Sequence, residues 1–408
     1  MNPLASVLAA TAVAALLALA YNTVVARQLG PIAYAEFATG LAAATMLAYA
    51  GGALAPITAH LSARYMAAGE PAKIRGLVST LLRRVVPLLV AGAVVCAIAA
   101  APIARAFHFA SPLSILAAYC VLAGLLVLSI ARSASRGAQQ FGRFGAGVAG
   151  EATIRLVAGM VLLALWPQPA AALAAYFIAL IVTFAAMLHG LRGLAPEAVP
   201  VPRADVTSML GATTALVVAM AAFQNIDILV VQRSFAPAEA GIYAAAWSFA
   251  RWMALVAFPI EALLLPQLSF EGERGRSVTS VAARLGGSML LMGAVPLAAF
   301  VMIPSQIVTT LYGPNYQDAA PLLFYLGLAA FAQYGCYLTV QVLLARAHTW
   351  PLAVFAAAGI VETAIIVGRH DSLHMVATVL VTMRLATLVT LLAGTWAAPR
   401  IIALPRRA

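Results

Sequence analysis

The sequence is poor in charge. Only 9% of its 408 residues are Asp, Glu, Lys or Arg, whereas 64% are apolar and the mean hydropathy is +0.98. An ordinary soluble domain carries roughly 25% charged residues. So few charges exclude a soluble globular class and indicate a chain that lies largely within a lipid bilayer.

Residue types and motifs that support enzymatic chemistry are also scarce. Cys96, Cys120 and Cys336 all fall inside apolar segments, and neither they nor the six histidines show metal-ligand spacing. The sequence has no Gly-rich phosphate loop, no His-Glu-x-x-His motif and no soluble segment long enough for a nucleotide-binding domain. We therefore expect no cofactor, no bound metal and no ATP-hydrolysing site, and we do not expect an enzyme.

Apolar segments of membrane-spanning length fill most of the chain. A helical span needs about 20 mostly apolar residues, and about twelve such segments occur. They cover 4–26, 35–60, 85–106, 113–131, 147–166, 171–190, 207–232, 242–266, 284–306, 321–344, 352–367 and 373–396. Lipid cannot hydrogen-bond a bare backbone, so each segment is expected to be a helix. The predicted fold class is an all-α polytopic membrane protein.

Basic residues fall unequally on the two sides of these spans. Seventeen Lys and Arg residues lie on the side of the two termini, and four lie on the other. The positive-inside rule then places both termini in the cytoplasm. The net charge of +11 is thereby explained by topology and by attraction to membrane lipids, and it requires no nucleic-acid partner.

A short turn occurs twice, 206 positions apart, as ARQLGPIAYAEFATG (26–40) and QRSFAPAEAGIYAAA (232–246). Identical pairs at this offset are Val24 and Val230, Val25 and Val231, Arg27 and Arg233, Pro31 and Pro237, and Ala38 and Ala244. Each copy joins the first span of a half to the second, with Pro restricting the turn. The alternative is a coincidence between two Ala-rich loops.

The repeat predicts two halves of six spans each. The expected domains are a lobe over 1–190, a cytoplasmic linker over 191–206, a lobe over 207–396 and a short tail over 397–408. Six is an even number, so both halves enter from the same side and are related by an axis along the membrane normal. Parallel repeats of this kind form two lobes around a central cavity and work by alternating access.

Three segments resemble those of bacterial polysaccharide flippases. They are VARQLGPIAYAEF, RGAQQFGRFGAGVAGEATIRLVAG and the stretch from NIDILVVQRSFAPAEAGIYAAAWSFARW to FPIEALLLPQLS. Such flippases belong to the multidrug/oligosaccharidyl-lipid/polysaccharide exporter superfamily. The resemblance implies export of a polyprenyl-pyrophosphate-linked oligosaccharide across the bacterial cytoplasmic membrane, with other polysaccharide-assembly membrane proteins as partners. Many such flippases have fourteen spans, whereas twelve are expected here.

Seven charged residues interrupt the apolar spans. They are Glu151, Arg155, Asp227, Arg251, Glu261, Glu362 and Arg384. Each would cost about 2.5–3.5 kcal/mol if it faced lipid at the bilayer centre. We therefore expect these side chains to face a cavity, the lobe interior or one another.

These charges supply the candidate binding residues. Arg can hold a phosphate through two parallel hydrogen bonds, which makes Arg155, Arg251 and Arg384 the candidate pyrophosphate ligands. Candidates for sugar contacts are Gln224, Trp247 and Trp252, and candidates for ion coupling or charge pairing are Glu151, Asp227 and Glu362.

Each candidate also has a purely structural interpretation. Glu151 and Arg155 are four residues apart and can pair on one helical face. Asp227 can cap its helix, and the aromatic residues can belong to the interfacial belt. Arg251 and Arg384 have no acid at helical spacing, so a structural role for either would need a partner from another helix.

Two other functions remain open from the sequence. A cation-coupled drug exporter of the same superfamily would favour carboxylates in its cavity, whereas the deep charges here include three arginines. A membrane-embedded polymerase or glycosyltransferase usually has a large loop rich in Asp, His or Arg. The longest expected external loop, 307–320, contains one acid, Asp318, and no His or Arg.

Overall fold

The structure is a computed structural model that describes residues 3–50, 54–194, 197, 199, 201, 223–251, 253, 278–345 and 350–397. Its elements are all helices: α1 (Pro3–Ala50), α2 (Leu54–Ala67), α3 (Pro71–Ala106), α4 (Pro112–Gly137), α5 (Phe141–Leu165), α6 (Pro169–Arg192), α9 (Pro237–Ala250), α11 (Val278–Met302), α12 (Pro304–Leu311), η1 (Pro314–Leu322), α13 (Leu323–Ala345), α14 (Trp350–Gly368) and α15 (Leu373–Ala397). Residues 223–234 are also helical. The chain divides into two compact units, Met1–Gly241 and Ile242–Ala408.

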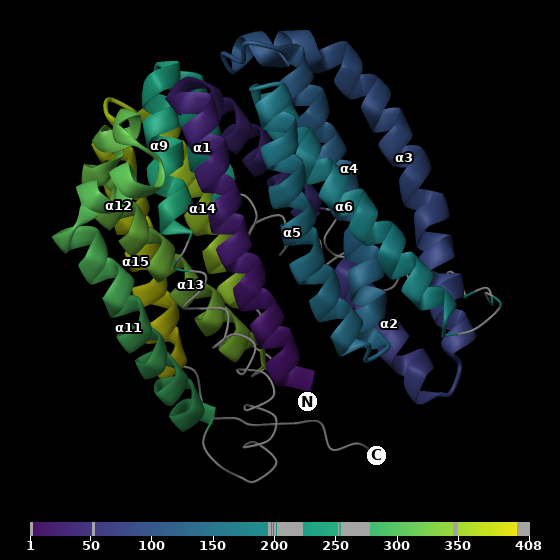
Figure 1. The fold of residues 1–408 in the computed structure, drawn as a ribbon. Helices are drawn as coiled ribbons and strands as arrows, with labels where there is room; N and C mark the ends of the chain where they lie inside the picture. The colour runs from purple at the N-terminus through teal and green to yellow at the C-terminus, as the bar shows by residue number, and fades with distance from the viewer. Residues whose placement is uncertain are drawn as a thin grey trace. The chain divides into compact units, whose positions relative to one another are not determined.

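The first repeated turn lies inside α1. Gly30 has φ 71° and ψ 174°, which breaks the helix between the two predicted spans. This left-handed region is open to glycine at little steric cost, and Pro31 then begins the returning helix. Figure 1 shows α1 in purple rising from the N-terminus and turning back at its upper end.

The second copy of the turn breaks the chain at the aligned positions. Helical residues 223–234 are followed by a bend at 235–236, and α9 begins at Pro237. The Glu239 carboxylate accepts a hydrogen bond from the Ala236 amide at 3.2 Å, which caps the start of α9. The prediction that both copies join consecutive helices is confirmed.

The two turns also contact each other within the first unit. A Cβ atom on Gly241 would lie 2.1 Å from the Pro31 carbonyl oxygen, so only glycine fits there without movement. Close by in the sequence, Gln232 donates to the Phe107 carbonyl at 3.0 Å and accepts from the Thr39 hydroxyl at 3.3 Å. The repeated motif therefore provides a tight packing surface as well as a chain reversal.

Four helices form the centre of the first unit. α1, α4, α5 and α6 contact one another, and α2 and α3 pack against α4. α3 begins at Pro71, well before the apolar segment predicted from residue 85, because its first turns are amphipathic and bury Ile74 and Leu77 in the core near α2. Arg132 and Arg136, which the sequence suggested were loop residues, lie in the last turns of α4.

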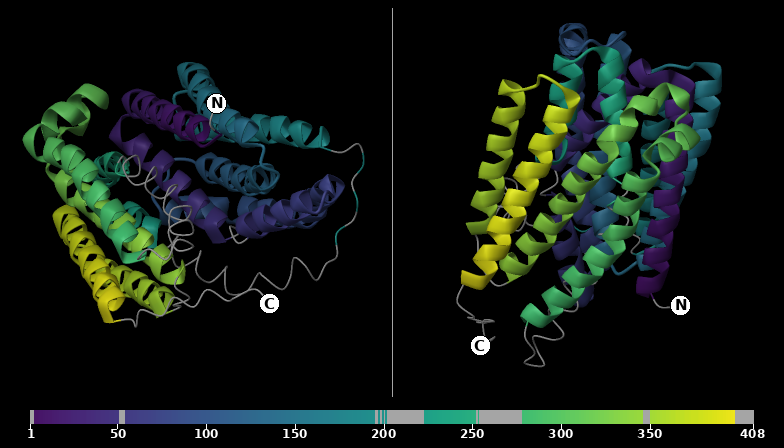
Figure 2. Two further views of the ribbon diagram at one scale, coloured as in Figure 1. Left: turned by 90° about the horizontal axis from the view of Figure 1, so that it is seen from below. Right: turned by 90° about the vertical axis from the view of Figure 1, so that its left-hand side faces the viewer.

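In the second unit, α13 and α15 pack together, and α14 packs along α15. Figure 2 shows α14 and α15 running side by side. α11 packs on α13 and bends by 88° into the short helix α12, which is followed by η1. The expected external loop 307–320 is therefore largely helical.

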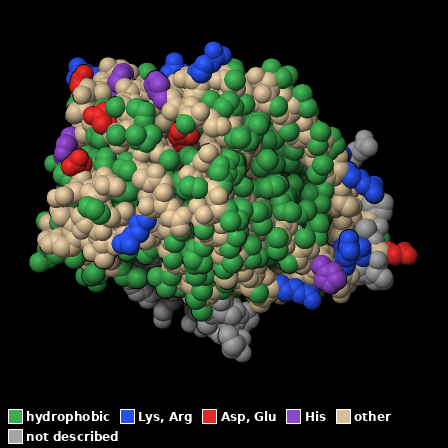
Figure 3. Space-filling model, turned by 45° about the horizontal axis from the view of Figure 1, so that its top comes forward, with side chains coloured by type: hydrophobic (Ala, Val, Ile, Leu, Met, Phe, Trp, Pro, Cys, Tyr) green, Lys and Arg blue, Asp and Glu red, His purple; other side chains and the backbone are tan. Residues whose placement is uncertain are grey.

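In the described part of the chain, eight helices are long and apolar enough to cross a membrane, or nine if α11 and α12 count as one bent span. α1 counts once in this number although it contains two predicted spans. Predicted spans 207–232 and 242–266 lie largely outside the described residues, as does Glu261. Figure 3 shows one face on which hydrophobic side chains cover a broad area, with most charged side chains near its margins. A multi-pass membrane protein is the class that fits these helices.

Candidate functional site

A buried cluster of charges lies in the middle of the first unit. Glu151 on α5 accepts from Arg155 Nη1 through Oε1 at 3.0 Å and from Arg132 Nη2 on α4 through Oε2 at 2.8 Å. The side chain of Glu151 is 10% exposed and that of Arg155 is 9% exposed. One carboxylate thus holds two guanidinium groups, and we call these three residues the arginine cluster.

Two tyrosines line the cluster. The Arg155 guanidinium carbon lies 4.5 Å from the ring centroid of Tyr176 on α6 and 5.5 Å from that of Tyr21 on α1. The Tyr21 hydroxyl donates to the Ala172 carbonyl at 2.6 Å, and its two ring neighbours Phe37 and Tyr176 meet it edge to face. Ring faces stabilise a guanidinium that has lost part of its hydration. Residues of α1, α5 and α6 therefore hold Arg155 in place.

The arginine cluster carries excess positive charge. Two arginines and one glutamate sum to +1, and both oxygens of the glutamate are already used. Among the described residues, the buried Nε atoms of Arg132 and Arg155 have no hydrogen-bond partner. A buried, charged donor without a partner costs free energy that an acceptor anion would recover. The arrangement is chemically suited to an oxyanion.

The second unit contains a different ion pair. Arg384 Nη2 on α15 lies 3.4 Å from Glu362 Oε1 on α14, and both side chains are almost fully buried. The thiol of Cys336 on α13 lies 3.6 Å from the Arg384 carbonyl oxygen. Arg384 therefore has the acidic partner from another helix that its structural interpretation required.

Arg251 directly follows α9 and stacks on an aromatic ring. Its guanidinium carbon lies 3.7 Å from the Trp247 ring centroid, and its backbone amide donates to the Trp247 carbonyl at 3.2 Å. Arg251 is half-buried and Trp247 is 8% exposed. These two sequence-predicted residues are brought together, whereas the other aromatic candidate, Trp252, lies outside the described residues.

Gln224 and Asp227 share the helix over 223–234. Gln224 is half-buried, and Asp227 is fully buried. The three-residue spacing places both on one side of that helix. Within the described part of the chain, no three His, Cys, Asp or Glu side chains gather as metal ligands.

The sequence reasoning missed two residues of the buried polar network. Arg132 was counted as a cytoplasmic loop residue, although the short turn between the predicted fourth and fifth spans implied a hairpin that could bring it near Glu151. Glu36 on α1 is 3% exposed and accepts from the Ala110 amide at 2.7 Å and from the Ser114 hydroxyl at 3.3 Å. Glu36 thus anchors the start of α4, a role that no local spacing indicated.

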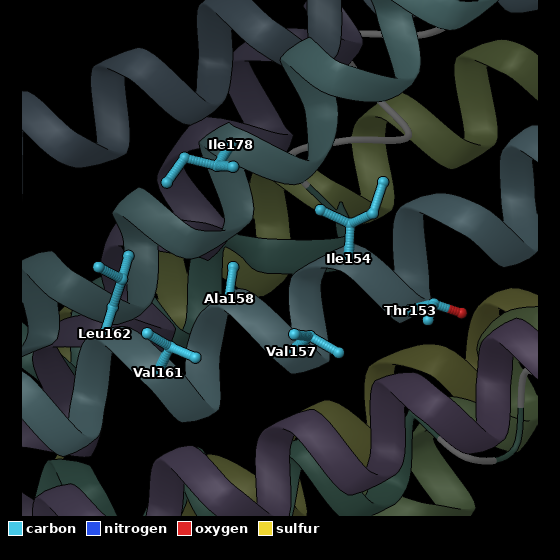
Figure 4. A pocket seen from close by; sticks show the side chains of 7 residues that line it. All are labelled: Thr153, Ile154, Val157, Ala158, Val161, Leu162 and Ile178. Carbon is cyan, nitrogen blue, oxygen red and sulfur yellow. The ribbon is translucent and has the colours of Figure 1, made fainter.

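An apolar pocket of about 450 Å³ lies beside α5, and Figure 4 shows the side chains that line it. It is lined by Thr153, Ile154, Val157, Ala158, Val161, Leu162 and Ile178. The Thr153 hydroxyl donates to the Ala149 carbonyl at 2.9 Å. The pocket therefore offers no polar chemistry for a charged headgroup.

Comparison with solved structures finds the same fold in known transporters. An inward-facing multidrug resistance MATE family transporter of the MOP superfamily matches with a TM-score of 0.80, at 13% identity over 94% of both chains. The lipid II flippase MurJ matches with a TM-score of 0.72, at 11% identity over 95% of this chain and 86% of that one. A MOP superfamily transporter from Pyrococcus furiosus matches at 0.68, at 14% identity over 97% and 95%.

No family model and no curated protein sequence matches this chain. At 11–14% identity, the solved structures establish the fold and leave the function open. The chain has the all-helical fold of MOP-superfamily transporters.

Proposed function

We propose that this protein is a flippase that moves a polyprenyl-pyrophosphate-linked oligosaccharide across the bacterial cytoplasmic membrane for polysaccharide biosynthesis. Two six-helix lobes, 1–190 and 207–396, would alternate access to a central cavity around the glycan, and the linker 191–206 would join them. The fold is shared with MurJ, which is a lipid II flippase. Energy would come from an ion gradient or from use of the glycan outside the cell.

The arginine cluster carries this proposal. A pyrophosphate that leaves water needs fixed cations and hydrogen-bond donors in place of its hydration shell. Arg132 and Arg155 offer both, because each keeps a buried Nε without a described partner while Glu151 fixes the two side chains. Arg can bind such oxyanions with paired hydrogen bonds. Trp247, Gln224 and Trp252 are proposed to contact the sugars, and Arg251 and Arg384 to contribute further cations.

A cation-coupled multidrug exporter is the second candidate. It is favoured by the MATE family transporter, which is a multidrug resistance protein. An organic cation, however, needs an available carboxylate, and Glu151 already contacts two guanidinium groups. The sharing of Glu151 therefore favours an anionic headgroup. A polymerase or glycosyltransferase is the least favoured, since the fold is that of transporters.

Reconstituted liposomes separate these functions. Purified protein would be placed in vesicles containing a fluorescent lipid-linked oligosaccharide, and an outer-leaflet quencher or glycan-cleaving enzyme would report translocation. We expect translocation by the native chain and at least a tenfold loss in Arg155→Gln. Gradient-driven uptake of an organic cation, with no lipid translocation, would instead establish the exporter.

The topology follows from the same proposal. Both termini are placed in the cytoplasm, with residue 315 outside and residues 72, 140 and 275 inside. Reporter fusions at these four positions test the arrangement. Activity of the same reporter at 315 and at 275 would contradict it, because an odd number of predicted spans separates the two positions.

A further inference from the structure

Arg136 extends the arginine cluster toward the end of α4. It lies four residues after Arg132, so the two side chains share one helical face. Its Nη2 donates to the Ser133 hydroxyl at 3.3 Å, and its guanidinium carbon lies 5.5 Å from the ring centroid of Phe144 on α5. Arg136 is thus held at the α4–α5 junction, beside the cluster.

The three arginines form a gradient of depth and exposure. Arg136 is exposed, the Arg132 side chain is 22% exposed and the Arg155 side chain is 9% exposed. Arg136 is next to the last residue of α4, and Arg132 lies five residues before that end, which corresponds to about 8 Å of helix. Arg155 lies fourteen residues into α5, which corresponds to about 21 Å.

This arrangement is electrostatically unfavourable by itself. Two guanidinium groups share a single carboxylate, Glu151, and Arg136 adds a third positive charge four residues from Arg132. Like charges at i and i+4 destabilise a helix. Side chains that served only to mark the cytoplasmic side of the membrane could all remain in water. Arg132 instead gives up most of its hydration, and its Nε has no described partner. An anion that moves along the three side chains would relieve this repulsion at each step.

We infer that Arg136, Arg132 and Arg155 form an approach path for a phosphate-bearing headgroup, from the loop end of α4 to the buried centre of the first unit. The inference rests on the proposed function and extends it. Arg136 captures the anion, Arg132 receives it and Arg155 holds it beside Tyr21 and Tyr176. The ligand class is a prenyl-linked pyrophosphate ester, and the prenyl tail is not recognised by these three residues.

Binding kinetics of the full chain in detergent micelles test this path. The probe is a fluorescent short-chain prenyl pyrophosphate, followed by stopped-flow mixing at low and high salt. In Arg136→Gln we expect association to be about tenfold slower at low salt and dissociation little changed, because a rim charge acts mainly on encounter. In Arg132→Gln we expect at least a tenfold weaker Kd, mostly through faster dissociation.

Two variants control for charge and for local structure. Arg143 is exposed in the first turn of α5 and donates to the Gly190 carbonyl at 2.6 Å, outside the path. Arg143→Gln removes the same charge near the same end of the bundle, so it should leave association unchanged. Arg136→Lys keeps the charge and should keep most of the association rate. Melting temperatures identify any variant that fails to fold.

Several results would overturn the path. Association as slow in Arg143→Gln as in Arg136→Gln would mean a general surface potential. Native kinetics in Arg136→Gln, or equal binding of the matching prenyl alcohol, would remove the anion path altogether. The probe carries no glycan, so these failures leave glycan translocation intact. A protein that binds the probe as expected but moves no lipid-linked oligosaccharide would instead refute the proposed function.

Discussion

The two units bury carboxylates in different ways. In the first unit, Glu151 is shared between Arg132 and Arg155, at 2.8 and 3.0 Å. In the second, Glu362 contacts Arg384 at 3.4 Å across two neighbouring helices. A pair of one acid and one base can hold helices together, whereas a cluster with more cations than anions can accept an anionic ligand. The excess positive charge of the first group, rather than burial alone, is what makes it the candidate anion site.

Removing the shared acid should have the largest effect. Glu151→Gln leaves Arg132 and Arg155 close together without a counter-charge, which we expect to cost about 3–5 kcal/mol of unfolding free energy. Denaturation in mixed micelles measures this. The matched control is Glu70→Gln, because Glu70 pairs with Lys73 at 2.7 Å where both side chains are substantially exposed. Equal stability of the two variants would contradict a buried role for Glu151.

Double substitutions should distinguish the ion pair of the second unit from the arginine cluster of the first. Arg384→Gln is expected to destabilise by about 3 kcal/mol, and Glu362→Gln in the same chain should recover most of it. In the first unit, Glu151→Gln should not rescue Arg155→Ala, because Arg132 would remain without an acid. A stable Glu362→Gln, Arg384→Gln double variant that moves no glycan would show that Arg384 also contacts the substrate.

In each unit, aromatic stacking on an arginine should contribute less to the free energy of unfolding than the ion pairs do. Tyr176→Leu removes a ring 4.5 Å from the buried Arg155, and Trp247→Leu removes one 3.7 Å from the half-buried Arg251. We expect the cation–π part to be about 2 kcal/mol for the desolvated arginine and about 1 kcal/mol for the other. Tyr176→Phe and Trp247→Phe keep an aromatic ring, so each should lose less stability than the matching Leu variant. A larger loss of unfolding free energy in Trp247→Leu than in Tyr176→Leu would contradict this order.

The smallest effect should come from the repeated turns. Gly30→Ala places a Cβ at φ 71° and ψ 174°, a conformation that side chains rarely adopt, but no other atom lies within 4 Å of it, so the cost is local strain of about 1 kcal/mol. Ala236→Gly, at the aligned position of the second copy, should change stability by less than that. The same denaturation assay compares them. Equal effects would mean that both turns have the same backbone requirement.

The apolar segments predicted most described helices, because hydrocarbon permits little besides a helix over such lengths. The pairing of Glu151 with Arg155 was also accessible from four-residue spacing. Arg132 and Tyr176 were not, because their contacts depend on how α4 and α6 rotate about their axes. Glu362 and Arg384 lie on separate helices. The sequence therefore identified each as a charge within an apolar span but could not indicate that they pair.

The reversal at Gly30 also has a consequence for biogenesis. The helices before and after Gly30 are joined through a single non-helical residue, so they can enter the bilayer only as a hairpin. Between residues 4 and 35 the sequence contains one charged side chain, Arg27, and it lies exposed near the tip. On the proposed topology, insertion of this hairpin would translocate one charge for two spans. A loop or tag inserted after Gly30 would uncouple them and expose each helix to insertion on its own.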